Sequence, residues 1–179
     1  MTGATHFSGR VWTFGDHVDT DVILPARYLM LTDPRELAEH LMEDSDHPDF
    51  ARQVRPGDLI VAGRLFGLGS SREHAPAALK QAGVAAIIAP SFARIFLRNA
   101  INIGLPVIEH DTLPGLVTEG EELAIDLRAG TVRRLHDGAV YSIRRYPEFL
   151  LGLIEAGGLI AATRQQMAGA VPSPQGHGC

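Results

Sequence analysis

Two glycines, two serines and an arginine stand within six residues near the middle of the chain, and together they could activate a hydroxyl and hold a carboxylate. Gly67 and Gly69 allow the backbone to turn sharply and to approach a ligand closely. Ser70 and Ser71 follow, and at the start of a helix free N–H groups and the positive dipole end favour a negative charge. Arg72 adds a planar guanidinium that can hold a carboxylate through two hydrogen bonds. The combination indicates an active site.

The same segment also matches a capping box, which is a structural motif without chemistry. Ser70 would be the N-cap of a helix, Glu73 would reach back to it, and Arg72 would be a solvated residue of the first turn. A catalytic pair of Ser70 with His74 is conceivable, but the Gly-x-Ser-x-Gly elbow of hydrolases is missing. The Gly-Lys-Ser/Thr of a phosphate-binding loop is missing too. The residues alone leave the active-site and the capping interpretations open.

The composition predicts one well-packed domain that does not bind nucleic acid. The chain has 179 residues, of which 45% are hydrophobic and 21% charged, and a domain of this size buries roughly 70% of its unfolded surface. A net charge of −5 disfavours nucleic-acid and acidic-membrane partners. No membrane-spanning apolar run and no signal peptide are visible, so a cytoplasmic location is expected. We expect a single domain over residues 1–164 and a disordered tail over 165–179.

Cysteine usage limits the metal chemistry that this chain can perform by itself. Its single cysteine, Cys179, is the last residue. The chain therefore forms no intrachain disulfide and has no cysteine set for an iron–sulfur cluster or a zinc site. Its eight histidines are scattered, without a His-x-x-x-His pair. Any metal that the chemistry needs would have to come from another chain.

Strand-like and helix-like runs alternate through the first part of the chain. Predicted strands cover residues 8–14, 58–63, 84–89 and 106–109, and predicted helices cover 34–43, 71–82 and 91–103. Residues 16–28 and 45–53 are predicted to be loops. Because continuous apolar strands between helices are typical of a parallel sheet with both faces covered, the fold class is predicted to be α/β.

The later part of the chain changes character. Short runs at 122–127, 131–135 and 139–144 are separated by Ala-Gly and Asp-Gly pairs that suit hairpin turns. A last helix is predicted between Pro147 and Gly157. The sequence therefore predicts a mostly parallel core sheet with an added antiparallel element.

Three segments, residues 19–29, 67–76 and 92–106, resemble the signatures of the aconitase swivelling-domain family, in the family's order. The resemblance extends from about residue 11 to 156, and the chain is similar in particular to the separate small subunits of 3-isopropylmalate dehydratases. It implies a three-layer β/β/α domain and a hydro-lyase that interconverts 2- and 3-isopropylmalate by dehydration and rehydration, in leucine biosynthesis. It also implies a large partner subunit that carries a [4Fe–4S] cluster, with no cluster bound by this chain alone.

The resemblance also implies roles for individual residues. Ser70 matches the family's serine base, which takes the proton next to a substrate carboxylate. Ser71 would help to hold the substrate or the oxyanion, Arg72 would bind a substrate carboxylate, and Asp21 would orient its neighbours. The backbone loop with its two glycines would supply the N–H groups. Arg94, in the third segment, is interpreted as mainly structural.

The resemblance implies that the residues of a short loop after a Tyr-Leu pair determine which substrate a family member accepts. Homoaconitases, which act on a tricarboxylate, have an arginine there, whereas this chain has Met30 and Leu31. Burying an unpaired carboxylate against these side chains would cost several kcal/mol, so a dicarboxylate with an alkyl substituent is predicted. Alternative activities are those of a homoaconitase or of a dimethylmalate or methylmalate/citraconate hydratase. The chain could instead be a stand-alone carboxylate-binding domain without catalysis. For the loop itself, the alternative is that it merely packs on the core of its own domain and does not contact the substrate.

Overall fold

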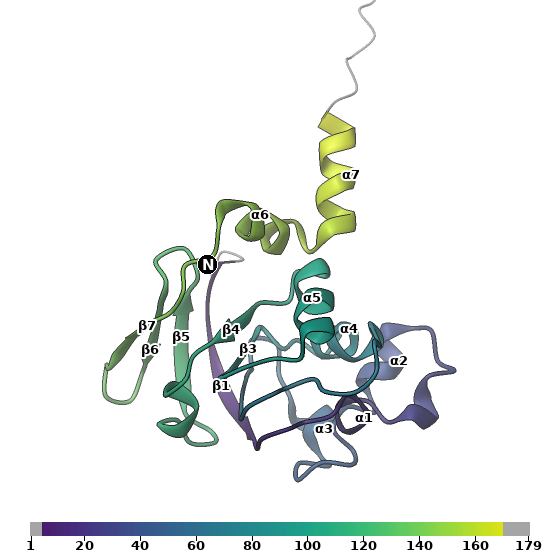
Figure 1. Ribbon diagram of the computed structural model, residues 1–179, viewed down its shortest axis with the longest axis horizontal. Coiled ribbons are helices and arrows are strands. Elements are labelled where there is room, and N and C mark those ends of the chain that lie inside the picture. The colour runs from purple at the N-terminus through teal and green to yellow at the C-terminus, as the bar shows by residue number, and fades with distance from the viewer. Residues whose placement is uncertain (1–4, 170–179) are drawn as a thin grey trace, which may run out of the picture.

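A single sheet of seven strands organises the computed structural model, which describes residues 5–169 (Figure 1). The strands are β1 (His6–Phe14), β2 (Leu59–Ala62), β3 (Ala86–Ala89), β4 (Val107–Glu109), β5 (Glu122–Asp126), β6 (Thr131–Arg134) and β7 (Val140–Ser142). Their order across the sheet is β4-β3-β2-β1-β5-β6-β7. Strands β1 to β4 are parallel, and β1, β5, β6 and β7 are joined by antiparallel pairs. The predicted parallel core and the predicted antiparallel element are both confirmed.

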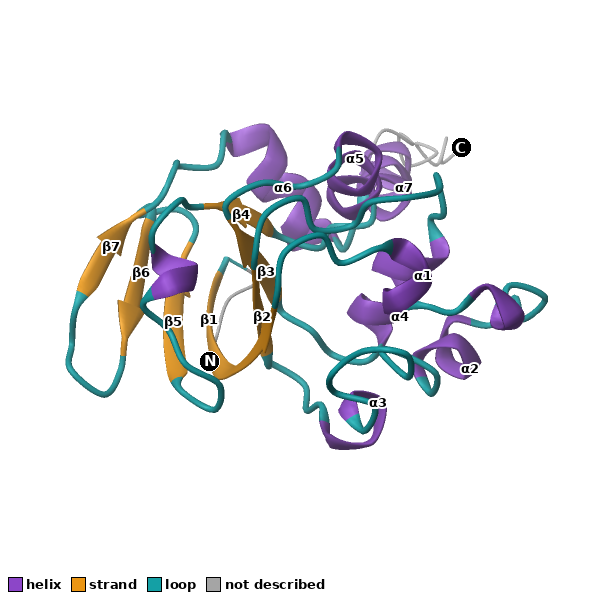
Figure 2. Ribbon diagram, turned by 60° about the horizontal axis from the view of Figure 1, so that its bottom comes forward, coloured by secondary structure: helices purple, strands orange, loops and turns teal. Residues whose placement is uncertain are grey.

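Strand β1 belongs to both halves of the sheet. Its first part, His6 to Arg10, pairs antiparallel with β5, and its second part, Val11 to Phe14, pairs parallel with β2. The antiparallel strands curl away from the helices, so they form a layer of their own (Figure 2). The result is the three-layer β/β/α arrangement that the family resemblance implies.

The parallel strands are buried on both faces, as their continuous apolar sequences predict. In β2, Ile60 and Ala62 belong to the hydrophobic core beneath the helices, whereas Leu59 and Val61 belong to the second core beneath β5 and β6. All four residues of β2 are buried. This alternation fixes the register of the central strands, because a shift by one residue would exchange the two faces.

The helices are α1 (Thr20–Ile23), α2 (Pro34–Ala38), α3 (Phe50–Gln53), α4 (His74–Gln81), α5 (Arg94–Asn102), α6 (Glu148–Ala156) and α7 (Leu159–Gly169), with 3-10 turns at Ala26–Tyr28 and Leu113–Gly115. Helices α1 to α4 gather on one side of the parallel strands, opposite β5 to β7 (Figure 2). Within residues 5–169 no helix is long and apolar enough to cross a membrane.

Several predicted helix and loop boundaries are wrong. Asp33 caps α2 through its side chain and Pro34 follows at the first helical position, as predicted, but the helix ends at Ala38 and not near residue 43. The cause is Met42, which is fully buried with a φ of 60° and donates its N–H to Ile23. The predicted loops 16–28 and 45–53 contain α1 and α3.

The C-terminal prediction also needs correction. Helix α6 ends at a left-handed Gly157, as the glycine pair predicts. A further helix, α7, then extends away from the body of the molecule to Gly169 (Figure 1). The segment 165–169 of the predicted disordered tail is therefore helical, and residues 170–179 lie outside those that the structure describes.

Candidate functional site

The three signature segments meet at the edge of the sheet where the parallel strands end. The segment after β2 lies between the segments that follow β1 and β3: Leu68 bridges to Asp19 on one side, and Phe66 bridges to Phe92 on the other. The N–H of Thr20 donates to the carbonyl oxygen of Leu68 at 2.7 Å. Ligands of α/β sheets bind outside the carboxyl ends of parallel strands, so this edge is where a site is expected.

Both glycines of the central signature are required by geometry. Gly67 has a φ of +82° and Gly69 a φ of +101°, conformations that side chains disfavour. A Cβ on Gly67 would collide with the ring of Phe96, and a Cβ on Gly69 would lie 2.6 Å from Oδ1 of Asp19. The segment can therefore pass this close to its neighbours only without side chains at these two positions.

The structure contradicts the capping-box interpretation of the serines. Helix α4 begins at His74, and its N-cap is Glu73, which makes no side-chain capping bond. Ser70 and Ser71 are exposed in the turn before the helix. Among the described residues, the backbone N–H groups of Ser70, Ser71 and Arg72 have no recorded acceptor, and Ser70 makes no hydrogen bond to His74. Three consecutive N–H groups are therefore available to a ligand beside an unengaged hydroxyl.

The structure brings Arg72 and Asp21 together from two different signatures. Nη1 of Arg72 donates to Oδ1 of Asp21. The arginine side chain is largely buried, at 20% exposure, whereas that of Asp21 is 58% exposed. For the rest of the guanidinium, no acceptor is recorded among residues 5–169. One edge of the fork is held by Asp21, so the guanidinium is fixed in place and its remaining N–H groups can meet a carboxylate.

The third signature contributes a residue that the sequence analysis missed. Asn99 of α5 is buried, at 4% exposure, and its Nδ2 donates to the carbonyl oxygen of Ser71 at 3.4 Å. Arg94, which was singled out instead, is exposed at the first turn of the same helix. The sequence signal that could have identified Asn99 is a polar amide placed among apolar residues of the helix, between Phe96 and Ala100, which are both buried in the core.

The two residues of the predicted substrate loop differ in exposure. Met30 is 90% exposed, which is unusual for an apolar side chain of this size. Leu31 is partly buried and packs against the core beneath the helices. The loop thus presents one apolar side chain to its surroundings, and the interpretation of a loop that only packs on its own core describes Leu31 but not Met30.

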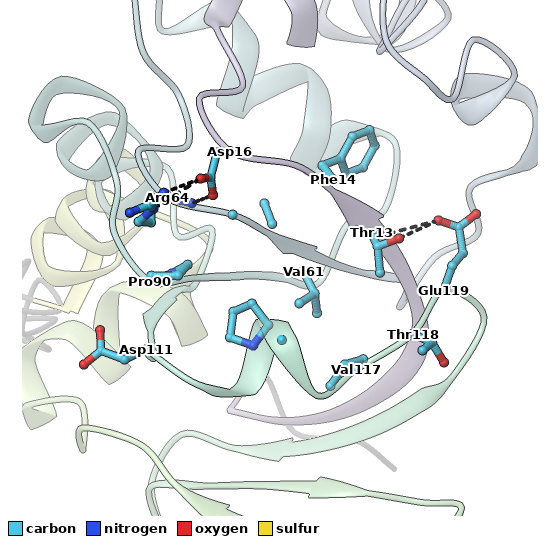
Figure 3. Close-up of a pocket in the computed structure, with 14 residues that line it drawn as sticks. Thr13, Phe14, Asp16, Val61, Arg64, Pro90, Asp111, Val117, Thr118 and Glu119 are labelled. Atoms are coloured by element: carbon cyan, nitrogen blue, oxygen red, sulfur yellow. Dashed lines mark hydrogen bonds and ion pairs between the residues drawn. The ribbon is translucent and has the colours of Figure 1, made fainter.

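A cavity of about 780 Å³ lies at the edge of the sheet where the parallel strands end (Figure 3). It is lined by the ends of β1 and β2 and by the loop from Asp111 to Glu119. The Arg64 guanidinium donates to Asp16 at its rim at 2.8 Å and lowers the pKa of that carboxyl. The serines do not line the cavity, so in this chain the candidate site is an open surface.

Within residues 5–169, no group of three His, Cys, Asp or Glu side chains is arranged to hold a metal ion. The candidate site offers hydroxyls, N–H groups and a guanidinium, which are ligands for anions and not for iron. The described part of the chain therefore does not fit an iron–sulfur cluster by itself.

Comparisons with known proteins agree with this architecture. Residues 30–112 match the family model of the aconitase C-terminal domain. The 3-isopropylmalate dehydratase small subunit of Aquifex aeolicus is 53% identical over 162 residues, which cover 90% of this chain and 96% of that protein. The methanogen homoaconitase small subunit of Methanothermobacter thermautotrophicus is 57% identical over 152 residues, covering 85% and 87%.

A solved structure gives the same result at the level of the fold. The crystal structure of 3-isopropylmalate dehydratase from Methanocaldococcus jannaschii superimposes with a TM-score of 0.84 at 41% identity, covering 91% of this chain and 96% of that one. The chain therefore belongs to the aconitase family, and within it to the group of 3-isopropylmalate dehydratase small subunits and their relatives.

Proposed function

We propose that this chain is the small subunit of a hydro-lyase that interconverts 2-isopropylmalate and 3-isopropylmalate by removing water and adding it back. One observation carries the proposal: the serine hydroxyl, three N–H groups without recorded acceptors and the braced guanidinium are assembled on one open edge of the sheet. An open site of this kind suits a subunit whose active site is completed by a partner. The names of its relatives, which are 3-isopropylmalate dehydratase small subunits, support the same activity.

The proposal assigns the [4Fe–4S] cluster to the large subunit, because the described part of this chain has no ligands for it. When bound there, the cluster supplies a Lewis acid for the departing hydroxyl. This chain supplies the remaining functions, which are proton removal, stabilisation of negative charge and orientation of the substrate.

Ser70 would be the base. Its hydroxyl, once ionised, takes the proton from the carbon next to a substrate carboxylate, and it returns a proton when water adds back. The neighbouring N–H groups stabilise negative charge on the serine oxygen and on the substrate, since an array of N–H groups forms an anion site even without a helix terminus. Arg72 would fix the substrate carboxylate by hydrogen bonds, while Asp21 keeps the guanidinium from turning away.

The relatives' names alone do not choose the substrate, because the homoaconitase small subunit is as similar to this chain as the isopropylmalate enzymes are. The exposed side chain of Met30 supports isopropylmalate as the substrate. Contact between its side chain and an isopropyl group would contribute about 0.8 kcal/mol per buried methylene, whereas a third carboxylate would meet no charge there. The second candidate is an isopropylmalate/citramalate activity, which a Methanocaldococcus jannaschii relative has in its name at 54% identity.

Reconstitution tests the proposal. The chain is mixed without oxygen with a 3-isopropylmalate dehydratase large subunit, and the absorbance of the unsaturated intermediate is followed with isopropylmalate, citramalate and homocitrate as substrates. We expect turnover only from the pair, with isopropylmalate preferred. Turnover by the isolated, iron-free chain would refute the division of labour. Binding of diacids without turnover by any reconstituted pair would favour the stand-alone binding domain.

A further inference from the structure

A cluster of polar side chains surrounds the start of the substrate loop, and Glu43 lies at its centre. Oε2 of Glu43 accepts hydrogen bonds from the Tyr28 hydroxyl at 2.7 Å and from Nη2 of Arg27 at 2.8 Å. Its other oxygen, Oε1, lies 2.8 Å from Nδ1 of His40. The guanidinium of Arg27 also donates twice to Asp44, at 2.7 and 3.0 Å. We refer to these five residues as the Glu43 cluster.

The cluster fixes the tyrosine in several directions at once. The imidazole of His40 stacks on the ring of Tyr28, with the centroids 3.7 Å apart and the planes within 7°. The guanidinium carbon of Arg27 lies 4.9 Å from the same ring, within the range of a cation–π contact. Burial would raise the pKa of Glu43, but the hydrogen bonds from His40, Tyr28 and Arg27 lower it to about 2. The carboxylate therefore stays charged throughout the ordinary pH range.

The fixed tyrosine stands two residues before Met30. From Tyr28 onward the loop is held by backbone bonds, such as that from the N–H of Leu31 to the carbonyl oxygen of Tyr28 at 3.0 Å, and by the packing of Leu29 and Leu31 against the core. At the far end, Asp33 caps α2 and so fixes the exit of the loop. The exposed Met30 thus lies on a short span anchored at both ends.

Stability alone does not account for the cluster. Its charged side chains are partly solvated, with exposures of 51% for Arg27, 30% for Glu43 and 50% for Asp44. Ion pairs with such exposure each contribute at most about 1 kcal/mol to folding. What they do restrict is the freedom of one tyrosine, and through it the direction in which the following residues project.

We propose that Glu43 is a positioning residue for substrate choice: by fixing Tyr28 it holds Met30 in the direction in which it meets the substituent of the substrate. The inference rests on the proposed function. Glu43 and Tyr28 form the anchor of the loop, and in this proposal neither touches the substrate. Removing either side chain therefore changes the discrimination between substrates, while Ser70 and Arg72 keep their roles.

Two variants remove the anchor in different ways. Glu43→Ala deletes the acceptor, and Tyr28→Phe deletes only the hydroxyl while keeping the ring stacked on His40. Glu39→Ala is the matched control, because Glu39 is an exposed carboxylate four residues away with no ion pair recorded in the described part of the chain. Glu43→Gln keeps an acceptor of the same size and is the conservative rescue.

The readouts are hydrogen exchange of amides 28–32 in the full chain and the ratio of kcat/KM for isopropylmalate over homocitrate with the large subunit bound. We expect Glu43→Ala and Tyr28→Phe to speed the exchange and to lower the ratio at least fivefold. Glu43→Gln should recover part of the ratio, and Glu39→Ala should change neither quantity. The loss in the ratio should arise mainly from KM, because the catalytic groups stay in place.

An unchanged ratio in both anchor variants, with or without faster exchange, would overturn the inference and leave the cluster a structural role. An equal fall in kcat for both substrates would overturn it as well, because that pattern reports damage to the catalytic edge. Failure of the wild-type pair to turn over any diacid is a different result. It refutes the proposed function before any variant is compared, and the inference falls with it.

Discussion

Replacing Ser70 by alanine is the sharpest test of whether this serine acts as a catalytic base or only as a helix cap. The side chain is exposed, is not an N-cap and makes no recorded hydrogen bond with the described residues. Surface substitutions of this kind change stability by less than about 0.5 kcal/mol. For a domain of this size that corresponds to a melting shift below about 2 °C. Loss of a proton-abstracting base, in contrast, costs roughly 10²- to 10⁴-fold in rate, which is about 3–5 kcal/mol of barrier.

The assay compares thermal unfolding of the chain with turnover of the reconstituted pair for wild type, Ser70→Ala and the control Ser142→Ala, a similarly exposed serine in β7. We expect three similar melting temperatures and a rate loss of at least 100-fold for Ser70→Ala alone. If Ser70→Ala instead keeps near-normal turnover and melts several degrees lower, as loss of a cap worth about 1 kcal/mol would produce, the assignment of Ser70 as base is refuted.

Three further predictions follow from the site. Arg72→Lys should lower kcat/KM at least tenfold, because a point charge cannot reproduce a guanidinium held by Asp21 while gripping a carboxylate; a near-normal value would mean that the arginine does not touch the substrate. Met30→Arg should shift the ratio of kcat/KM for isopropylmalate over homocitrate tenfold or more towards homocitrate, which corresponds to about 1.4 kcal/mol. Leu31→Arg should mainly lower the melting temperature, because Leu31 packs on the core. The reverse result would assign the substrate contact to Leu31. Because the pKa of Glu43 in the folded protein is lowered from 4.5 to about 2, its contribution to stability is present above pH 4.5 and is lost as the pH falls towards 2. The free energy of unfolding, measured with denaturant at several pH values, should therefore fall less steeply at low pH for Glu43→Gln than for the wild type. Identical slopes would contradict this.

The parts of the fold that depend on local pattern were predictable from the sequence. The observed β2, Leu59–Ala62, lies inside the predicted strand 58–63, because a run of buried apolar residues can be satisfied only between two covered faces. The hairpin turns at Gly130 and Gly138 were predictable for a similar reason, since both residues have a positive φ near 74°. The Asp33 cap of α2 is equally local.

The features that depend on tertiary contacts were not predictable. Ser70 and Glu73 have the spacing of a capping box, yet the strand-like bridges of Phe66 and Leu68 to neighbouring segments delay the start of α4 until His74. A sequence signal for a cap is therefore not sufficient when the preceding backbone is already engaged elsewhere.

The same holds for the site. Which residues of the signatures could act on a carboxylate was visible in their types, but the pairing of Arg72 with Asp21 joins residues 51 positions apart. The role of Asn99 as a donor to Ser71 depends on the docking of α5 against the signature loop. The Glu43 cluster depends on the turn at Met42, which brings residues 40–44 back to the loop. Neither propensity nor periodicity encodes such contacts.

Strand β1 pairs with both β2 and β5, and this has a consequence for the synthesis of the chain. The first part of β1 is synthesised long before β5, the strand with which it pairs and in which Asp126 lies opposite His6. Contacts between residues so distant in sequence form slowly, because loop closure precedes any gain from pairing. Until β5 leaves the ribosome, the nascent parallel half exposes the N-terminal part of β1 as an open edge, and open edges recruit other chains. Efficient production of this protein therefore depends on how long that edge stays unpaired during translation.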